Sequence, residues 1–339
     1  MVYHRGGGPG VLTLVDKPVT EPGPGQVRVR VIRSGVNPSD WKTRRLIDGQ
    51  PVSPPQVPNQ DGAGIIDAVG QAVDPARLGQ PVWLFEAAWG RSEGTAQEHA
   101  IVPAGQAVDL PGHASFDLGA SLGVPFLTAH RCLTVNDSGP DRLGPGLLRG
   151  RIVLVSGGAG AVGNAAIQLA RWSGATVITT VSSPAKARLA AAAGAGHVID
   201  YRRQRAAEAV RAIAPQGVHT VVEVAPGVNA ALDLAVIAPH GCVACYASDG
   251  GEQIVLPGRS LTPLNARWQF LSVYSVPAAA KQHAIEDVQA ALAAGAIGVG
   301  EHNGLPLHHF PLARAARAHQ AVEQSVTGKV LIDVADPPA

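Results

Sequence analysis

RIVLVSGGAGAVGNAAIQLAR, residues 151–171, is the stretch that decides the fold of this chain. Its β-branched run at 152–155 leads into the pattern Gly158-x-Gly160-x-x-Gly163, and an amphipathic helical pattern follows at once. Strand, tight glycine turn and helix in this order form a dinucleotide-binding fingerprint. Such glycines let backbone amides approach a pyrophosphate, and the helix N-terminus offers partial positive charge to that anion. A glycine turn that only packs a helix tightly against a sheet is the open alternative.

The residues after the next expected strand indicate which dinucleotide would bind. An NAD site usually carries an acidic residue there, which accepts a hydrogen bond from the ribose 2′-hydroxyl. No Asp or Glu occurs from 142 to 199, and the expected strand at 176–180 is followed by Ser182, Ser183 and Lys186. Hydroxyls and an ammonium group suit a 2′-phosphate. Ser183 also suits the N-cap of a helix, and both roles are compatible. The pattern predicts NADP(H).

Composition limits the classes of function. With 339 residues, 46% of them hydrophobic and 16% charged, the chain is long enough for two globular domains. A net charge of +1 argues against nucleic acid or another polyanion as partner. No apolar run has the length of a membrane span, and residues 1–10 lack the apolar segment of a signal peptide. We therefore expect a soluble cytoplasmic protein.

The three cysteines, Cys132, Cys242 and Cys245, are too few for a disulfide framework. Cys242 and Cys245 form a CxxC pattern, but they lie in a strand-like run at 241–247. Side chains three residues apart on a strand point to opposite faces, which suits neither a bridge nor a metal. We expect buried strand cysteines.

The chain changes character near residue 123. Before it, proline and glycine punctuate short strand-like runs at 27–32, 64–69 and 80–84, which indicates a β-rich domain. Strand and helix patterns then alternate as far as residue 246. This alternation predicts a parallel sheet with helices on both faces.

The remaining segments define the expected domain layout. We predict a further strand at 270–274, helices at 278–294 and 311–322, and a strand at 329–334 that returns to the first domain. The fold class is therefore α/β, a Rossmann doubly wound parallel sheet plus a discontinuous β-rich domain. The expected domains are 1–122 with 278–339, which would be catalytic, and 123–277, which would bind the dinucleotide.

Short motifs in order along nearly the whole chain resemble the medium-chain dehydrogenase/reductase superfamily, and within it the zinc-free quinone oxidoreductases related to zeta-crystallin. The motifs are Gly35-Val-Asn37-Pro38-Ser-Asp40, Pro58-Asn-Gln-Asp61-Gly-Ala-Gly64, Ala68-Val-Gly70, Leu127-Thr128-Ala129, Gly157–Gly163, Lys186, Asp200-Tyr201 and Gly328-Lys329-Val330. The resemblance implies a GroES-like fold for the β-rich domain. It also implies a homodimer that pairs through an edge strand around 270–274.

Departures from the superfamily's other branches are equally informative. Zinc-dependent relatives need a cysteine near Asn37, a histidine-glutamate pair near Gln60-Asp61 and a four-cysteine lobe after Phe85, and this sequence has none of them. We therefore expect no metal site, and we place His308-His309 on a solvated polar turn. The tyrosine of enoyl-thioester reductases falls at Asp48, and that of the quinone reductases falls near Lys42.

The resemblance also implies which residues would form the site. Asn37 and Thr128 would lie near the nicotinamide, and Trp41 and Lys42 would face the acceptor; Asn37, Lys42 and Thr128 are the catalytic candidates. The cofactor-binding residues, from pyrophosphate through 2′-phosphate to nicotinamide ribose, would be Gly157, Gly158, Gly160, Ala161, Val162, Gly163, Thr180, Ser182, Lys186, Tyr201, Tyr246, Ala247 and Ser248, together with Lys329. Each of four candidates also has an ordinary structural interpretation. Asn37 could be a turn residue, and Thr128 could be a residue at the start of a helix. Lys42 could be an exposed surface lysine, and Tyr201 could cover an apolar edge.

The function expected from these observations is an NADPH-dependent, zinc-independent transfer of hydride to a quinone or another conjugated carbonyl acceptor. Delocalisation in such an acceptor spreads the negative charge that hydride addition creates, so no metal is needed. The alternatives are an enoyl (alkene) reductase of a biosynthetic pathway and a cofactor-binding protein without turnover, as the lens crystallins of this family suggest. A zinc alcohol dehydrogenase is a weaker third possibility. The partner would be a small molecule.

Overall fold

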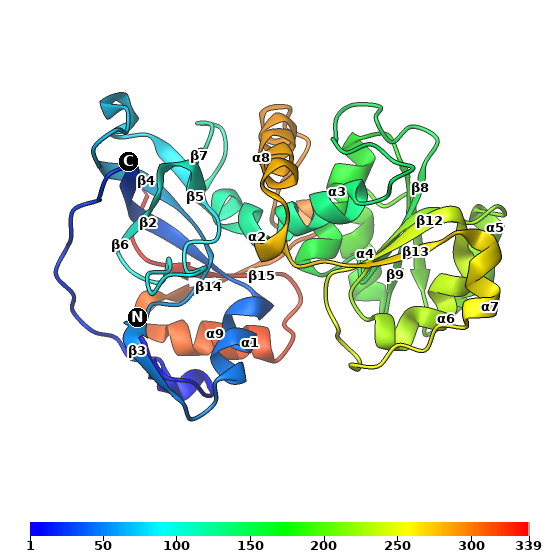
Figure 1. Cartoon of the computed structure of the whole chain (residues 1–339), viewed down its shortest axis with the longest axis horizontal. Helices are drawn as coiled ribbons and strands as arrows, with labels where there is room; N and C mark the ends of the chain where they lie inside the picture. Colours follow the sequence, from blue (N-terminus) through cyan, green and yellow to red (C-terminus); the bar gives the residue numbers. More distant parts are fainter. Residues whose placement is uncertain (338–339) are drawn as a thin grey trace. The chain divides into compact units, whose positions relative to one another are not determined.

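The computed structural model describes residues 1–337 and divides into two compact units (Figure 1). Unit 1 comprises Met1–Val124 and Pro306–Ala339, and unit 2 comprises Pro125–Leu305. The first boundary falls inside helix α2 (Phe116–Thr134), close to the expected change at 122–123.

The second boundary differs from the expected division, because residues 278–305 belong to unit 2 and not to the β-rich domain. This segment contains helix α8 (Ala278–Ala293). Its Asp287 carboxylate accepts hydrogen bonds from His130 Nε2 at 2.8 Å and from Arg142 Nε at 2.8 Å. These buried polar contacts, remote in sequence, hold α8 in unit 2.

Unit 1 is built on a seven-stranded sheet in the order β14-β15-β2-β4-β5-β7, with β6 also paired to β2, and on a separate β1-β3 pair. Neighbouring strands are antiparallel except for β14 and β15, which run parallel. The strands are β1 (Tyr3–Arg5), β2 (Gln26–Val36), β3 (Pro51–Gln56), β4 (Asp61–Val69), β5 (Pro81–Leu84), β6 (His99–Pro103), β7 (Ala107–Asp109), β14 (Leu307–Pro311) and β15 (Lys329–Asp333), and the helices are α1 (Pro38–Leu46) and α9 (Ala315–Glu323).

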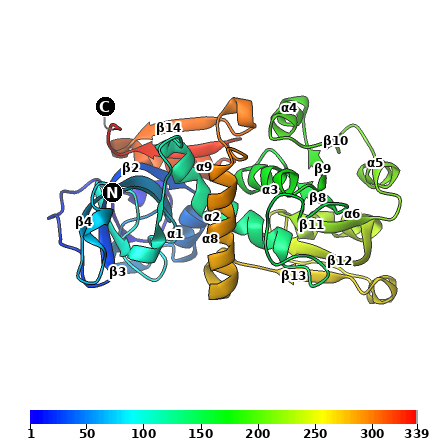
Figure 2. The same cartoon turned by 90° about the horizontal axis from the view of Figure 1, so that it is seen from above.

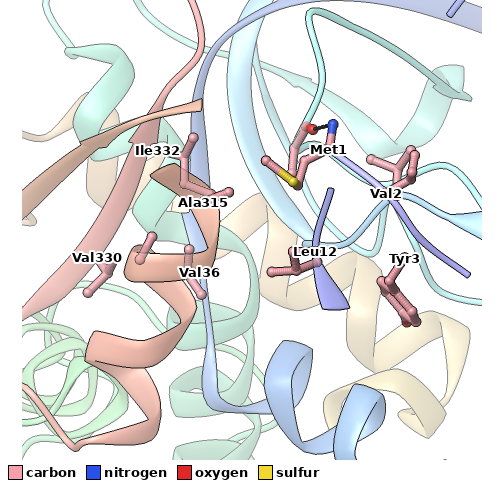
Figure 3. Close-up of a cluster of buried hydrophobic side chains, with 11 residues drawn as sticks. Met1, Val2, Tyr3, Leu12, Val36, Ala315, Val330 and Ile332 are labelled. Atoms are coloured by element: carbon pink, nitrogen blue, oxygen red, sulfur yellow. Dashed lines mark hydrogen bonds between the residues drawn. The ribbon is translucent and has the colours of Figure 1, made fainter. Parts of the chain in front are cut away.

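A cluster of buried apolar side chains joins the first and last segments of unit 1 (Figure 3). The side chains labelled there are Met1, Val2, Tyr3, Leu12, Val36, Ala315, Val330 and Ile332. The ammonium of Met1 donates to the carbonyl of Ala96 at 2.9 Å, so the start of the chain is anchored in this cluster. Buried Arg44 of α1 also forms an ion pair of 2.6 Å with Glu323 of α9.

Unit 2 contains a six-stranded parallel sheet in the order β10-β9-β8-β11-β12-β13. The order runs outward from β8 in both directions. Right-handed crossovers therefore place the helices before the reversal on one face of the sheet and the helices after it on the other. Figure 2 shows α3 and α4 on one side of the sheet and α5 and α6 on the other. The elements are β8 (Ile152–Ser156), α3 (Ala161–Trp172), β9 (Thr176–Val181), α4 (Pro184–Ala192), β10 (His197–Asp200), α5 (Ala206–Ile213), β11 (Val218–Glu223), α6 (Pro226–Val236), β12 (Ile237–Cys245), α7 (Gly258–Leu261) and β13 (Arg267–Phe270). The predicted Rossmann architecture is confirmed.

Two local predictions are wrong. The edge strand is β13, which ends at Phe270, whereas Val273–Ser275 forms a 3₁₀ turn and not part of a strand at 270–274. Phe270 pairs with Cys245, the last residue of β12, so no partner strand extends further. His308 and His309 lie in β14 rather than in a turn, because that segment pairs with β15.

All three cysteines are buried and free, and Cys242 and Cys245 lie in strand β12, as predicted. Within residues 1–337, no helix is both long and apolar enough to cross a bilayer.

Candidate functional site

The glycine turn between β8 and α3 is held by contacts that leave no room for side chains. Gly157 has a positive φ of 73°, and its N–H donates to the carbonyl of Thr180 at 3.1 Å. A Cβ added to Gly158 would lie 2.1 Å from Thr179 Oγ1, and one added to Gly163 would lie 2.4 Å from the Gly157 carbonyl. The turn therefore requires glycine at these positions for packing, which was the alternative interpretation of the motif.

The same turn also leaves an open helix N-terminus. Gly160 is the N-cap of α3, no side chain caps it, and the first turn of the helix contains no acidic residue. The N–H groups of Ala161, Val162 and Gly163 have no acceptor within the helix, as at the start of any α-helix. Three unclaimed donors and the helix dipole together suit an anion such as a pyrophosphate. Packing and phosphate binding are thus compatible in this turn.

The ends of β9 and β10 bring the predicted 2′-phosphate residues together. Ser183 caps α4 by accepting a hydrogen bond from the N–H of Lys186 at 3.3 Å, as expected. The N–H of Tyr201 donates to the carbonyl of Val181 at 3.1 Å, so Tyr201 lies beside the residue that precedes Ser182. The Tyr201 side chain is 52% exposed, which leaves its ring accessible.

Two arginines follow Tyr201 and were not among the predicted residues. Arg202 and Arg203 continue the turn after β10, and Arg203 Nε lies 3.6 Å from the Asp200 carboxylate. The run Tyr-Arg-Arg at the end of an apolar strand was the sequence signal that could have identified them. They add positive charge at the edge where Ser182 and Lys186 lie.

The segment after β12, where the nicotinamide ribose is expected, is fixed by backbone contacts to the end of β11. Tyr246 N–H donates to the carbonyl of Glu223 at 3.0 Å, and Asp249 N–H donates to that of Val224 at 3.1 Å. Burial raises the pKa of the Tyr246 phenol well above its usual value, so this side chain stays neutral. Ala247 and Ser248 lie between these anchored residues. Thr128, the other predicted residue on this unit, is buried in α2.

In unit 1, three predicted or motif residues form one buried polar cluster. Asn37 Nδ2 donates to Asp61 Oδ2 at 2.7 Å, and Lys329 Nζ donates to Asn37 Oδ1 at 2.7 Å. Lys329 Nζ also lies 3.6 Å from Asp61 Oδ2, and the N–H of Val124 donates to both Asp61 oxygens. The contacts assign the orientation of the Asn37 amide, since its oxygen faces the ammonium and its nitrogen faces the carboxylate.

Burial and charge oppose each other in this cluster. Burial raises the pKa of Asp61, and Lys329 and the hydrogen bonds from Asn37 and Val124 act against that rise. Burial likewise lowers the pKa of Lys329, against the attraction of Asp61. Removing either partner would leave an uncompensated buried charge.

The predicted acceptor-facing residues follow directly on α1. Asn37 caps this helix, and its N–H donates to Asp40 Oδ2 at 2.7 Å. Lys42 Nζ lies 5.8 Å from the centroid of the Trp41 ring, a cation–π distance, and Lys42 is half-buried rather than fully exposed. Asn37 is therefore both a turn residue and the centre of a polar cluster.

The donor set at the positions of the zinc ligands is unsuited to that metal. Asn37 and Asp61 hydrogen-bond each other, and Gln60 Oε1 accepts a hydrogen bond from Ala88 N–H at 3.1 Å. Across the part of the chain that the structure describes, no three His, Cys, Asp or Glu residues are grouped so that they could hold a metal ion.

Comparisons with known proteins match both units. The model of the alcohol dehydrogenase GroES-like domain matches residues 23–112, and that of the zinc-binding dehydrogenase family matches residues 161–294. Over 334 residues the chain is 28% identical to a quinone oxidoreductase of Sus scrofa, covering 96% of this chain and 94% of that protein.

Solved structures give the same picture. An NAD-dependent alcohol dehydrogenase superposes with a TM-score of 0.85 at 26% identity, covering 98% of this chain and 99% of that one. The Escherichia coli quinone oxidoreductase complexed with NADPH superposes with a TM-score of 0.79 at 25% identity, covering 98% of each chain. Similar folds thus occur both in an NAD-dependent enzyme and in one complexed with NADPH, so the fold alone does not distinguish the two coenzymes.

Proposed function

Because the chain is an oxidoreductase of the medium-chain dehydrogenase/reductase superfamily, similar to its quinone oxidoreductases, we propose that it reduces a quinone or another conjugated carbonyl compound with NADPH, without zinc. Unit 2 is the coenzyme-binding domain, and unit 1 is the catalytic domain. A homodimer and a cytoplasmic location stay predictions.

The end of β9 carries the choice of NADPH. The end of β9 itself carries no carboxylate that would accept from a ribose 2′-hydroxyl, and it offers Ser182 and Lys186. On the neighbouring strand Asp200 accepts from the N–H of Arg202 and lies 3.6 Å from Arg203 Nε, and Tyr201 follows it. A carboxylate would repel a 2′-phosphate, whereas an ammonium and hydroxyls bind it by charge-assisted hydrogen bonds. The exposed Arg202 and Arg203 add to the attraction.

The protein's part in the reaction is binding and orientation. NADPH supplies the hydride when bound, and the open N-terminus of α3 would hold its pyrophosphate. In unit 1 the Lys329–Asn37–Asp61 cluster fixes the start of α1, and with it Trp41 and Lys42. The Lys42 ammonium would stabilise negative charge on the acceptor oxygen or donate a proton to it.

Zinc independence rests on the chemistry of the side chains. A catalytic zinc in proteins takes three ligands from Cys, His, Asp and Glu. Here Asn37 replaces the cysteine, and Asp61 is already engaged by Asn37, Lys329 and Val124. Metal analysis of the purified active protein tests this point, and stoichiometric zinc required for turnover would contradict it.

The coenzyme preference is tested with Lys186→Ala. This variant should lose about tenfold to a hundredfold in NADPH affinity, the range of a charge-assisted contact, and almost none in NADH affinity. Arg188→Ala is the matched control, because it removes one positive charge two residues along the same helix, on a different face. Equal losses for both variants, or equal losses for both coenzymes, would contradict the assignment.

The reaction is tested by following NADPH oxidation with a panel of quinones and enones. Product analysis separates hydroquinone formation from saturation of an alkene, which is the outcome expected of an enoyl reductase. Tight NADPH binding without turnover on any acceptor would instead indicate a coenzyme-binding protein, and the proposed activity would have to be withdrawn.

A further inference from the structure

Two carboxyl side chains are completely buried together in unit 2. Glu223 is the last residue of β11 and Asp233 lies in α6, and each has 0% exposure. The Glu223 carboxylate accepts hydrogen bonds from Ser156 Oγ at 2.6 Å, from Asn229 Nδ2 at 3.0 Å and from the N–H of Ala225. It is therefore fully supplied with donors.

Asp233 has the opposite surroundings. No hydrogen-bond donor within residues 1–337 reaches either of its carboxyl oxygens, and the polar group that it contacts is the carboxyl of Glu223. Two ionised carboxylates only accept hydrogen bonds, so a contact between them requires a proton on one. Burial first, and the charge of Glu223 second, raise the pKa of Asp233 to about 9. The Glu223 oxygens already accept three hydrogen bonds and those of Asp233 accept none, so the proton is placed on Asp233.

The pair lies where three segments of the proposed coenzyme site meet. Ser156, which donates a hydrogen bond to Glu223, directly precedes the glycine turn. Ala225 is the N-cap of α6, and the backbone carbonyl of Glu223 holds Tyr246 at the start of the ribose segment. The strands β8 and β11 are also the neighbours at which the strand order reverses. Ligands of doubly wound sheets bind at such a reversal, beyond the carboxyl ends of the strands.

We propose that Glu223 and Asp233 share one proton at neutral pH, that Glu223 is the positioning residue joining these three segments, and that loss of the shared proton in alkaline solution weakens coenzyme binding. The proposal rests on NADPH as the ligand of unit 2. Losing the proton places two negative charges in contact beneath the turn. Their repulsion displaces the Glu223 carboxyl group, which holds Ser156 at the start of the turn, and the added charge also repels an anionic coenzyme.

The other titratable groups around the pair do not change charge in the relevant range. Cys245 of β12 is buried, which raises its pKa to about 12, and burial raises that of Tyr246 as well. On α5, Arg211 donates to the carbonyls of Ala235 and Pro215 at the exposed surface.

The test measures the NADPH dissociation constant between pH 7 and pH 10 for wild type and Asp233→Asn. The 2′-phosphate of NADPH is a phosphate monoester, which loses its second proton at about pH 6. The charge of the coenzyme is therefore nearly constant between pH 7 and pH 10. Asparagine keeps an N–H donor toward Glu223 and does not titrate. Wild type should weaken by about tenfold more than the variant over this range, as expected for one unit charge acting over roughly 12 Å in a medium of effective dielectric near 20.

A second variant and a control complete the experiment. In Glu223→Gln the amide donates to Asp233, so the alkaline transition should move to lower pH, which a purely structural residue would not cause. Glu208→Gln removes an exposed carboxylate of the same unit and should follow wild type. If the variants do not fold, infrared spectroscopy of wild type at pH 8 should still show the carbonyl stretch of a protonated buried carboxylic acid, because burial raises the pKa of Asp40 only to about 7 and that of Asp233 to about 9.

The outcomes separate this proposal from the one that it rests on. No NADPH binding by wild type at pH 7 would overturn the coenzyme assignment itself. Normal binding at pH 7 with identical pH profiles for wild type and Asp233→Asn, or no infrared band of a protonated acid, would overturn only the shared proton.

Discussion

The buried proton on Asp233 makes the stability of the protein depend on pH, and Asp233→Asn should remove that dependence. The pKa of Asp233 is about 9 in the folded state and 3.8 in its ordinary state, so the folded protein binds the proton more tightly than the unfolded chain. The resulting stabilisation is complete below pH 3.8, declines as the pH rises, and is lost once the pH passes about 9.

The size of the effect follows from the slope of this decline. One proton contributes about 1.4 kcal/mol per pH unit between the two pKa values. Between pH 5 and pH 8, well inside that window, wild type should lose about 4 kcal/mol of unfolding free energy relative to the variant. A typical domain has about 5–15 kcal/mol in total, so the difference is easily measured.

The assay is urea unfolding followed by circular dichroism at pH 5, 6, 7 and 8, with wild type and Asp233→Asn measured in parallel. The comparison cancels the titration of all other groups, because both proteins contain them. The difference in unfolding free energy should change steadily with pH, in favour of the variant at higher pH. A difference that stays within about 1 kcal/mol across this range would refute the protonated carboxyl.

Three further predictions concern the turn and the two polar clusters. Gly163→Ala should destabilise unit 2 and abolish NADPH binding, since its methyl group would lie 2.4 Å from a backbone oxygen, whereas Gly160→Ala, at 3.4 Å, should fold normally in thermal melts. Burial raises the pKa of Asp287, but its hydrogen bonds outweigh burial and lower the pKa from 3.8 to about 2. The ionised carboxylate therefore stabilises the fold by about 2 kcal/mol above pH 4, and this stabilisation is lost as the pH falls toward 2. In an acid titration of unfolding free energy, Asp287→Asn should lack this loss. Lys329→Met should cost about 3–5 kcal/mol in urea unfolding because it leaves Asp61 buried without its cation, and Lys329→Arg should cost less; equal costs would contradict the ion pair.

The architecture of unit 2 could be predicted because its signals are local. Each strand and helix has its own hydrophobic periodicity, and α3 follows the glycine turn as the amphipathic pattern there predicts. The boundary of unit 2 could not be predicted, since it depends on Asp287, whose partners His130 and Arg142 are remote in sequence. The end of β13 could not be predicted either, because it is set by the last residue of the neighbouring strand β12.

The polar clusters show a different limit. Asn37 and Lys329 are 292 residues apart in sequence, so no period or spacing relates them, although each belonged to a motif that we singled out. Asp233 and Glu223, by contrast, did carry a signal. Each is an acidic residue within an apolar run, in AALDLAV and VVEV. A buried acid in such a run requires a partner.

The most direct test of the account is a titration of the purified protein with NADPH and with NADH at pH 7, followed by calorimetry. The site at the ends of β9 and β10 predicts that NADPH binds at least about tenfold more tightly than NADH, the equivalent of one charge-assisted contact. Equal affinity for the two coenzymes, tighter binding of NADH, or binding of neither would contradict it.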